Sequence, residues 1–311
     1  MSADGTKVPY FLVSKAGAKL DKSTPTLLYG YGGFEISLTP GYAATVGVGW
    51  LESGFSYAVA NIRGGGEFGP RWHQAALKEN RNKAYEDFEA VAKDLVSRGV
   101  TSASRLGIQG GSNGGLLMGN MLTRSPSLFG AIVCQVPLLD MRRYNKLLAG
   151  ASWVGEYGNP DKPEEWGYVQ KYSPYHTLRK GATAPPTLFT TSTRDDRVHP
   201  GHARKLAGKM CDLGLPVISY ENIEGGHGGA ADNKQRAFMS TLMYSFLHKA
   251  LAERTLGAAL AARPPQDGGR RVIANVFHRV SSVRGLPKWM APALSAIALA
   301  ALTLLQRRRL L

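Results

Sequence analysis

The chain has 311 residues, 43% of them hydrophobic, which is enough to bury a large core in one large domain or two small ones. Its two cysteines argue against a disulfide scaffold, and no zinc-type spacing of cysteine and histidine occurs, so we expect no metal site. The formal net charge of +15 by itself suggests a nucleic-acid or membrane partner, but the distribution of that charge along the chain weakens this interpretation.

Positive charge gathers towards the C-terminal end. Residues 255–311 hold eight arginines, one lysine and one aspartate, and so carry +8 of the +15. Residues 1–254 show no lysine- and arginine-rich helical pattern and no RNA-binding signature. We therefore expect no nucleic-acid partner.

The two ends of the chain bear on its location in the cell. The N-terminal residues lack the apolar stretch of a secretory signal, which favours a cytoplasmic protein. An apolar run at 291–305 is flanked by Trp289 and by the arginines 307–309, as in a membrane anchor, but Pro292 interrupts it. A helix of this length would span about 22 Å of the ~30 Å hydrocarbon core. We expect a flexible extension at 255–311, with weak membrane contact through 289–309 as the alternative.

The first hundred residues predict three strands and one helix. Apolar or alternating residues predict strands at 7–13, 26–30 and 54–63. From Phe88 to Val96 apolar residues recur at i, i+3, i+4, i+7 and i+8, which is the spacing of one helix face, and Gly99 ends that helix.

A glycine-rich turn follows the third predicted strand. The segment 64–69 fits the G-x-G-x-x-G pattern of dinucleotide-binding proteins, in which the turn opens directly into a helix that holds the pyrophosphate. Here Pro70, Trp72 and His73 follow, and helical periodicity begins only in the eighties. Glu67 would also stand beside the phosphates. We therefore expect no nicotinamide cofactor.

From residue 105 strand and helix patterns alternate regularly. A segment rich in proline, tryptophan and tyrosine interrupts them at 137–186, and the pattern loses its periodicity near residue 254, where we place a domain boundary between 1–254 and 255–311. Such alternation predicts a mostly parallel sheet with helices on both faces. The predicted elements are strands 105–109, 130–136, 187–191 and 216–220 and helices 114–124, 202–213 and 233–252.

The segment LGIQGGSNGGLLMG (106–119) contains the five residues Gly110-Gly111-Ser112-Asn113-Gly114, which fit G-x-S-x-G. This is the nucleophile elbow of α/β-hydrolases, a tight strand-to-helix turn in which glycines permit backbone angles and close approaches that side chains would block. Short glycine-serine motifs also occur in ordinary turns, so the rest of the chain must decide between a nucleophile and a small loop residue.

Three loops that follow predicted strands carry serine, aspartate and histidine in the chain order of an α/β-hydrolase. Ser112 follows the strand 105–109, Asp195 and Asp196 follow 187–191, and His227 follows 216–220. A serine hydroxyl needs a base to take its proton, and a buried carboxylate orients the imidazole that does so. The sequence therefore predicts an α/β-hydrolase fold and a Ser-Asp-His triad, with no cofactor.

Five motifs give the chain a resemblance to the catalytic domain of the prolyl oligopeptidase family, over roughly residues 5–250. They are YGYGGF (29–34), ANIRGGGEFG (60–69), GGSNGGLL (110–117), RDDRV (194–198) and GGHG (225–228). The resemblance implies Ser112 as nucleophile, Asp195 as orienting acid and His227 as base. It further implies an oxyanion hole made by the Tyr31 hydroxyl and the Asn113 backbone N–H.

The resemblance also implies a pocket for a proline side chain at the cleavage position of a short peptide. Trp153 would stack on the proline ring, with Tyr157, Phe34 and Val198 as apolar wall, while Arg197 would hold a substrate carbonyl. A flat aromatic suits a compact apolar ring better than a charged side chain. From composition alone, Trp153 and Tyr157 could instead be core aromatics of the segment 137–186.

Other interpretations stay open at this point. Glu156 lies between Trp153 and Tyr157, as it would to select a basic residue in the related oligopeptidase B group. A broad esterase or acyl-peptide hydrolase would use the same triad. The family carries a β-propeller before this domain, and no stretch here is long or repetitive enough for one. We therefore expect a fragment or a form that works without the propeller, and a silent remnant bound to a membrane or partner is a further alternative.

Overall fold

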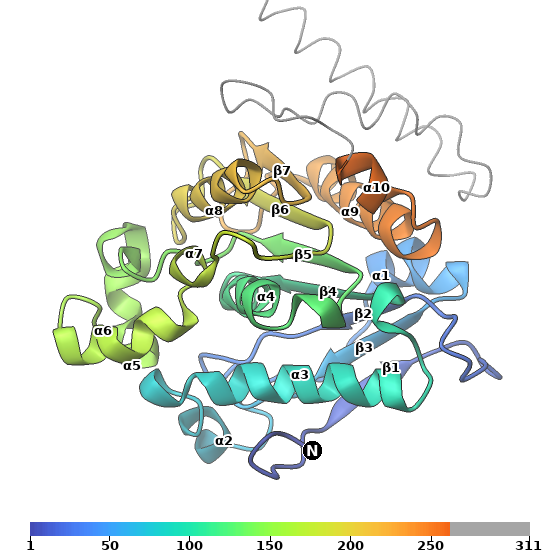
Figure 1. The fold of residues 1–311 in the computed structure, drawn as a ribbon, viewed down its shortest axis with the longest axis horizontal. Coiled ribbons are helices and arrows are strands. Elements are labelled where there is room, and N and C mark those ends of the chain that lie inside the picture. The colour runs from blue at the N-terminus through green and yellow to red at the C-terminus, as the bar shows by residue number, and fades with distance from the viewer. Residues whose placement is uncertain (262–311) are drawn as a thin grey trace, which may run out of the picture.

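The computed structural model describes residues 1–261, and within them seven strands form one sheet in the order β1-β3-β2-β4-β5-β6-β7. Figure 1 shows these strands side by side through the middle of the molecule. Their bounds are β1 Tyr10–Val13, β2 Thr26–Tyr29, β3 Ser56–Ala60, β4 Leu106–Gly111, β5 Ala131–Gln135, β6 Thr187–Ser192 and β7 Val217–Asn222.

The sheet is parallel except at one edge. Strand β1 pairs antiparallel with β3, with Tyr10 opposite Ala60, and every other neighbouring pair is parallel. Parallel pairing places the carboxyl ends of β2, β4, β5, β6 and β7 at one edge of the sheet, where loops carry functional groups in such folds. The predicted α/β-hydrolase fold with a mostly parallel sheet is thereby confirmed.

The helices connect successive strands, and each predicted helix is present with small shifts at its ends. The bounds are α1 Ala44–Gly49, α2 Pro70–Gln74, α3 Asn82–Ser97, α4 Asn113–Arg124, α5 Val154–Tyr157, α6 Pro163–Val169, α7 Pro174–Thr177, α8 Gly201–Asp212, α9 Asn233–Leu247 and α10 Leu256–Ala261. The helix expected at 233–252 is α9 followed by a π-helical turn at His248–Ala252.

Alternate residues of the central strands enter two hydrophobic clusters on opposite faces of the sheet. In β5, Ile132 and Cys134 join the first cluster, whereas Ala131 and Val133 join the second. This alternation is the two-residue period of a strand, and because both faces are covered the strands read as continuous apolar runs. Burying each large apolar side chain completely stabilises the fold by roughly 2 kcal/mol.

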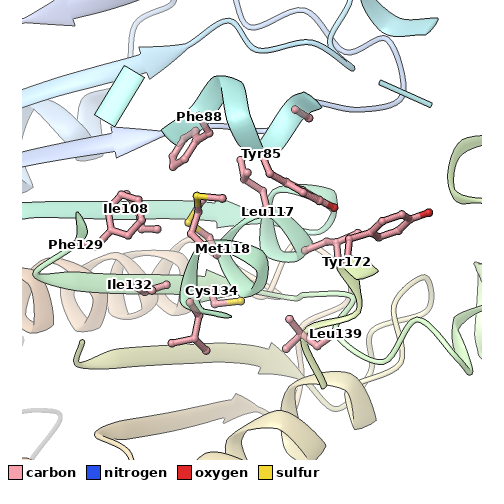
Figure 2. Close-up of a cluster of buried hydrophobic side chains, with 14 of the residues drawn as sticks. Tyr85, Phe88, Ile108, Leu117, Met118, Phe129, Ile132, Cys134, Leu139 and Tyr172 are labelled. Atoms are coloured by element: carbon pink, nitrogen blue, oxygen red, sulfur yellow. The ribbon is translucent and has the colours of Figure 1, made fainter. Parts of the chain in front are cut away.

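Different helices cover the two faces. The first cluster takes its helical side chains mainly from α3, α4 and α8, and Figure 2 shows Phe88 of α3 with Leu117 and Met118 of α4 gathered beside Ile108 of β4. The second cluster is built from Trp50 and residues of α9, together with Leu256 of α10. Close packing therefore continues beyond residue 254, the predicted boundary. The extension predicted at 255–311 lies outside the described residues from 262 onward, as does the apolar run at 289–309.

The glycine-rich turn at 64–69 corrects one sequence expectation. A short helix, α2, begins at Pro70 immediately after the turn, so the expectation that the turn does not open directly into a helix is wrong. The turn itself is filled by protein, because the Glu67 carboxylate accepts hydrogen bonds from the backbone N–H of Leu38 (2.9 Å) and from the Asn61 side chain (3.3 Å). A Cβ on Gly64 would lie 2.4 Å from the carbonyl oxygen of Gly32. The glycine therefore allows the loop after β2 to pass close by.

One buried histidine belongs to the framework. His202 of α8 is 2% exposed, and its Nδ1 accepts hydrogen bonds from the backbone N–H of Asp140 (3.0 Å) and Leu139 (3.3 Å). An Nδ1 that accepts hydrogen bonds is unprotonated. Burial lowers the pKa of His202 to about 4.

This histidine predicts a loss of stability in acid. Because an unfolded histidine titrates near 6.5, the unfolded chain gains a proton below that pH while the folded protein gains one only near pH 4. As the pH drops from 6.5 to 4, His202 alone should therefore lower the free energy of unfolding by about 3 kcal/mol. Urea unfolding at both pH values would measure this. His202→Asn keeps an acceptor and should show a smaller decrease, and an equal decrease would contradict the assignment.

No helix within residues 1–261 is both long enough and apolar enough to cross a bilayer.

Candidate active site

Ser112 lies between β4 and α4 on a turn with strained backbone angles. Its φ of 58° and ψ of −116° are unusual for a residue with a side chain. The neighbouring glycines make the turn possible, since a Cβ on Gly110 would lie 2.4 Å from the Gly114 carbonyl oxygen, and one on Gly114 would lie 2.7 Å from that of Gly30. The turn therefore has the geometry of a nucleophile elbow.

Asp195 and His227 meet at the carboxyl ends of β6 and β7. His227 Nδ1 lies 3.0 Å from Asp195 Oδ1 and 2.9 Å from Oδ2. The Asp195 side chain is fully buried, whereas the His227 side chain keeps 16% of its surface exposed. A carboxylate in this position fixes the ring orientation and leaves Nε2 to act on a substrate or a nucleophile.

The orientation of the Asp195 carboxylate is fixed by the backbone of its own loop. Oδ1 accepts hydrogen bonds from the N–H groups of Arg197 (3.0 Å) and Val198 (2.9 Å). Asp196 next to it is exposed. Of the two neighbouring aspartates, Asp195, which the resemblance implies as the orienting acid, is the one that contacts the histidine.

Ser112 is brought near Asp195 and His227 by the pairing of adjacent strands. Its N–H donates to the carbonyl oxygen of Gln135 (2.9 Å), the last residue of β5, and β5 pairs with β6, the strand that precedes Asp195. Within residues 1–261 no hydrogen bond joins Ser112 to His227. Such bonds are often long in a free enzyme and shorten when substrate binds, so the predicted proton transfer between the two is compatible with this geometry.

Both predicted oxyanion donors belong to residues close to Ser112, since Asn113 follows it in the chain and the Ser112 hydroxyl interacts with Tyr31. Burial raises the pKa of Tyr31, while the Arg197 and Arg81 guanidinium groups and the Ser112 hydroxyl act on it in the opposite direction. Tyr31 therefore keeps its proton at neutral pH and can donate it in a hydrogen bond. Asn113 is the first residue of α4, so its backbone N–H has no acceptor within the helix.

The predicted substrate-binding residues differ in exposure. Phe34 is half-buried and meets the ring of Tyr157 edge-on at 5.7 Å, but Tyr157 itself is fully buried and supports Phe34 from behind. Val198 is 2% exposed. The direct contacts with substrate predicted for Tyr157 and Val198 therefore stay predictions, since both side chains are buried in the first core cluster.

The remaining two predicted contacts come from adjacent segments. Trp153 is half-buried and ends a 3₁₀ helix, Leu148–Trp153, which packs against the first core cluster. Within this helix the N–H of Ala149 donates to the carbonyl oxygen of Arg197 (3.3 Å), so the Trp153 segment is tied to the Asp195 loop. The Arg197 side chain is exposed and free to reach a substrate carbonyl.

Glu156 does not face the solvent. Its carboxylate is buried, and Oε1 accepts hydrogen bonds from Arg81 Nη1 (2.8 Å) and from the backbone N–H of Phe34 (3.0 Å). Oε2 pairs with His73 Nε2 at 2.8 Å. Both of its oxygens are therefore occupied by groups of the protein. This role, and the part of Arg81 in it, was not found from the sequence, where Arg81 stands in the polar segment KENRNK without a motif.

Among residues 1–261 no three histidine, cysteine, aspartate or glutamate side chains are grouped so that they could hold a metal ion.

Comparisons with known proteins agree with this geometry. Residues 45–254 match the model of the family described as the prolyl oligopeptidase family. An uncharacterized peptidase, y4nA, of Sinorhizobium fredii is 54% identical over 252 residues, which are 81% of this chain and 35% of the relative. A prolyl endopeptidase of Elizabethkingia miricola is 40% identical over 251 residues, which are 79% of this chain and 35% of that relative.

Solved structures agree as well. The structure of a post-proline cleaving enzyme from Rickettsia typhi superimposes with a TM-score of 0.78 at 42% identity, over 81% of this chain and 36% of the other. The chain thus spans about a third of the length of the curated relatives it matches.

Proposed function

Because the chain belongs to the prolyl oligopeptidase family, we propose that it is a serine peptidase that cleaves short peptides after proline. The observation that carries the proposal is the hydrogen bond between the buried Asp195 carboxylate and His227 Nδ1. The loops that carry these two residues lie next to the strained Ser112 turn. This arrangement supplies a nucleophile, a base and the group that orients the base.

The proposed reaction proceeds through an acyl-enzyme. His227 Nε2 takes the proton of the Ser112 hydroxyl as the serine oxygen attacks the peptide carbonyl, and then gives that proton to the leaving amine. The Tyr31 hydroxyl and the Asn113 N–H stabilise the negative charge that develops on the carbonyl oxygen, each by about 3–4 kcal/mol. A water molecule then releases the acyl group by the same steps, again with His227 as the base.

The preference for proline over a basic residue is supported by Glu156. A pocket that selects arginine or lysine needs a carboxylate free to pair with the substrate. Here that carboxylate is buried and already paired with Arg81, so a second cation would have to displace a buried ion pair. The half-buried aromatic surface of Phe34 and Trp153 suits an apolar ring instead.

The experiment that tests this function compares kcat/KM on blocked fluorogenic Gly-Pro and Gly-Arg amides and on a simple aryl ester. Turnover that strongly favours the proline amide would support the proposal. A preference for the arginine amide would contradict the proposed pocket. Turnover of the ester alone would favour the esterase interpretation, and a folded protein that neither turns over nor reacts with a fluorophosphonate would favour the silent remnant.

Trp153→Ala tests the pocket separately from the triad. We expect kcat/KM on the proline amide to fall by about 10- to 100-fold, since an aromatic platform and its buried area contribute about 1.5–3 kcal/mol. The ester, which has no proline ring, should lose much less. Equal losses on both substrates would mean that the indole serves only the packing of the segment Leu148–Trp153.

A further inference from the structure

A buried arginine, Arg81, contacts the two segments that carry the predicted oxyanion donors. We propose that Arg81 is a positioning residue, which holds the Tyr31 loop and the start of α4 in the geometry that the developing oxyanion requires. The proposal rests on the peptidase function above. Arg81 is remote from these segments in sequence, standing between α2 and α3, and is 0% exposed.

The Arg81 guanidinium connects the two segments that carry the donors. Nη2 donates to the carbonyl oxygen of Gly32 (2.8 Å), the residue after Tyr31, and also to Oδ1 of Asn113, the residue after Ser112. One planar group therefore joins the loop that carries Tyr31 to the helix whose first N–H is the second donor. Its fixed donor geometry makes this connection directional, which a lysine ammonium cannot reproduce.

The Asn113 side chain completes the connection from the other side. Its Nδ2 donates to the carbonyl oxygen of Tyr31 itself (2.7 Å), and its Oδ1 accepts from the Tyr157 hydroxyl (2.8 Å) as well as from Arg81. With two donors on Oδ1, the amide can present only its Nδ2 to Tyr31. Loss of the guanidinium would leave this orientation to the tyrosine alone.

The loop has little space in which to move. A Cβ on Gly33 would lie 2.5 Å from Asn113 Nδ2 and 2.9 Å from Arg81 Nη2, so backbone and side chains are already in contact there. Beyond Gly33, the N–H of Phe34 donates to the same Glu156 oxygen that pairs with Arg81. The oxyanion loop and the first residue of the proposed substrate wall are thus fixed to one buried ion pair.

The expected consequence of losing Arg81 is slower chemistry more than weaker binding. A displacement of about 1 Å in a catalytic group can reduce turnover by about 100-fold, and we expect a loss of kcat of that size in Arg81→Ala with a much smaller change in KM. The ester should lose as much as the proline amide, because both form an oxyanion. This pattern is the reverse of the one expected for Trp153→Ala.

The test measures kcat per active site, with sites counted by fluorophosphonate labelling, for wild type, Arg81→Ala and Arg81→Lys. Counting labelled sites removes the contribution of unfolded protein. Millimolar guanidinium, but not an equal concentration of sodium, should restore part of the kcat of Arg81→Ala. Arg81→Lys should stay impaired, since an ammonium cannot reach Gly32 and Asn113 with the same geometry.

Arg63→Met is the matched control for loss of a buried arginine. Its guanidinium pairs with Asp87 (2.6 Å) and Asp4 (2.5 Å) and makes no hydrogen bond to the oxyanion loop or to α4 within the described residues. We expect Arg63→Met to lower the unfolding temperature while kcat per labelled site stays near that of wild type.

The outcomes separate the inference from the function beneath it. Wild-type kcat per labelled site in Arg81→Ala, or no rescue by guanidinium, would overturn the positioning role and leave the peptidase intact. A folded wild type that neither labels nor turns over would overturn both. If the Arg81 variants do not fold, Tyr157→Phe removes the other donor to the same Asn113 oxygen, and an unchanged kcat there would overturn the proposal.

Discussion

Ser112→Ala is expected to reduce kcat on a proline amide about a million-fold, since loss of the nucleophile removes the covalent route altogether. The variant keeps its turn, because the strain at φ 58° is set by the close approach of Gly110, Gly114 and Gly30 and not by the hydroxyl. His227 and Asp195 should keep their hydrogen bonds. Only residual catalysis by the oxyanion hole and by substrate binding would remain.

The measurement is amide turnover and fluorophosphonate labelling on wild type and variant side by side, with thermal unfolding as the control for folding. Ser97→Ala, an exposed serine of α3, serves as the matched substitution and should change neither quantity. Activity of Ser112→Ala within tenfold of wild type would refute the nucleophile, whatever the labelling result.

Asp195→Asn is expected to reduce kcat about 10⁴-fold by fixing the wrong histidine tautomer. Two backbone N–H groups, of Arg197 and Val198, point at Oδ1, so the amide of the variant must place its oxygen there and its NH₂ at the Oδ2 position. That NH₂ then donates to His227 Nδ1. The ring is left with its proton on Nε2, where it cannot accept the serine proton.

Asp196→Asn is the natural control, since this exposed neighbour differs only in its place on the loop. It should retain wild-type turnover. A loss in Asp196→Asn comparable to that in Asp195→Asn would show that the loop, rather than one carboxylate, is what matters.

Much of the fold could be predicted because its signals are local. The strand and helix periods, the glycines around Ser112 and the order of serine, aspartate and histidine each depend on residues close together in the chain. Parallel pairing then brings loops that follow successive strands to one edge of the sheet. Strand order alone does not choose between Asp195 and Asp196; the resemblance of the RDDRV motif implies Asp195, and in the structure Asp195 is the one that contacts His227.

The parts that were missed depend on contacts between distant segments. Arg81 and Glu156 are 75 residues apart, and Arg81 and Asn113 are 32 apart, so no local pattern links them. In the sequence, Glu156 read as a charge available to a substrate, because burial and partners cannot be seen there. Helix α2 was missed for another reason, since five residues are too few to show a helical period.

The strand order also determines when this site can first exist during synthesis. His227 follows β7, the last strand of the sheet, and its partner Asp195 follows β6, so the pair forms only once β7 has docked on β6 with Asn222 opposite Ser192. At 5–20 residues per second, a ribosome needs on the order of 10 s to pass from Ser112 to His227. Throughout that interval the nascent chain carries the serine without its base. The proposed peptidase activity can therefore appear only after β7 has paired with β6, late in the synthesis of the catalytic fold.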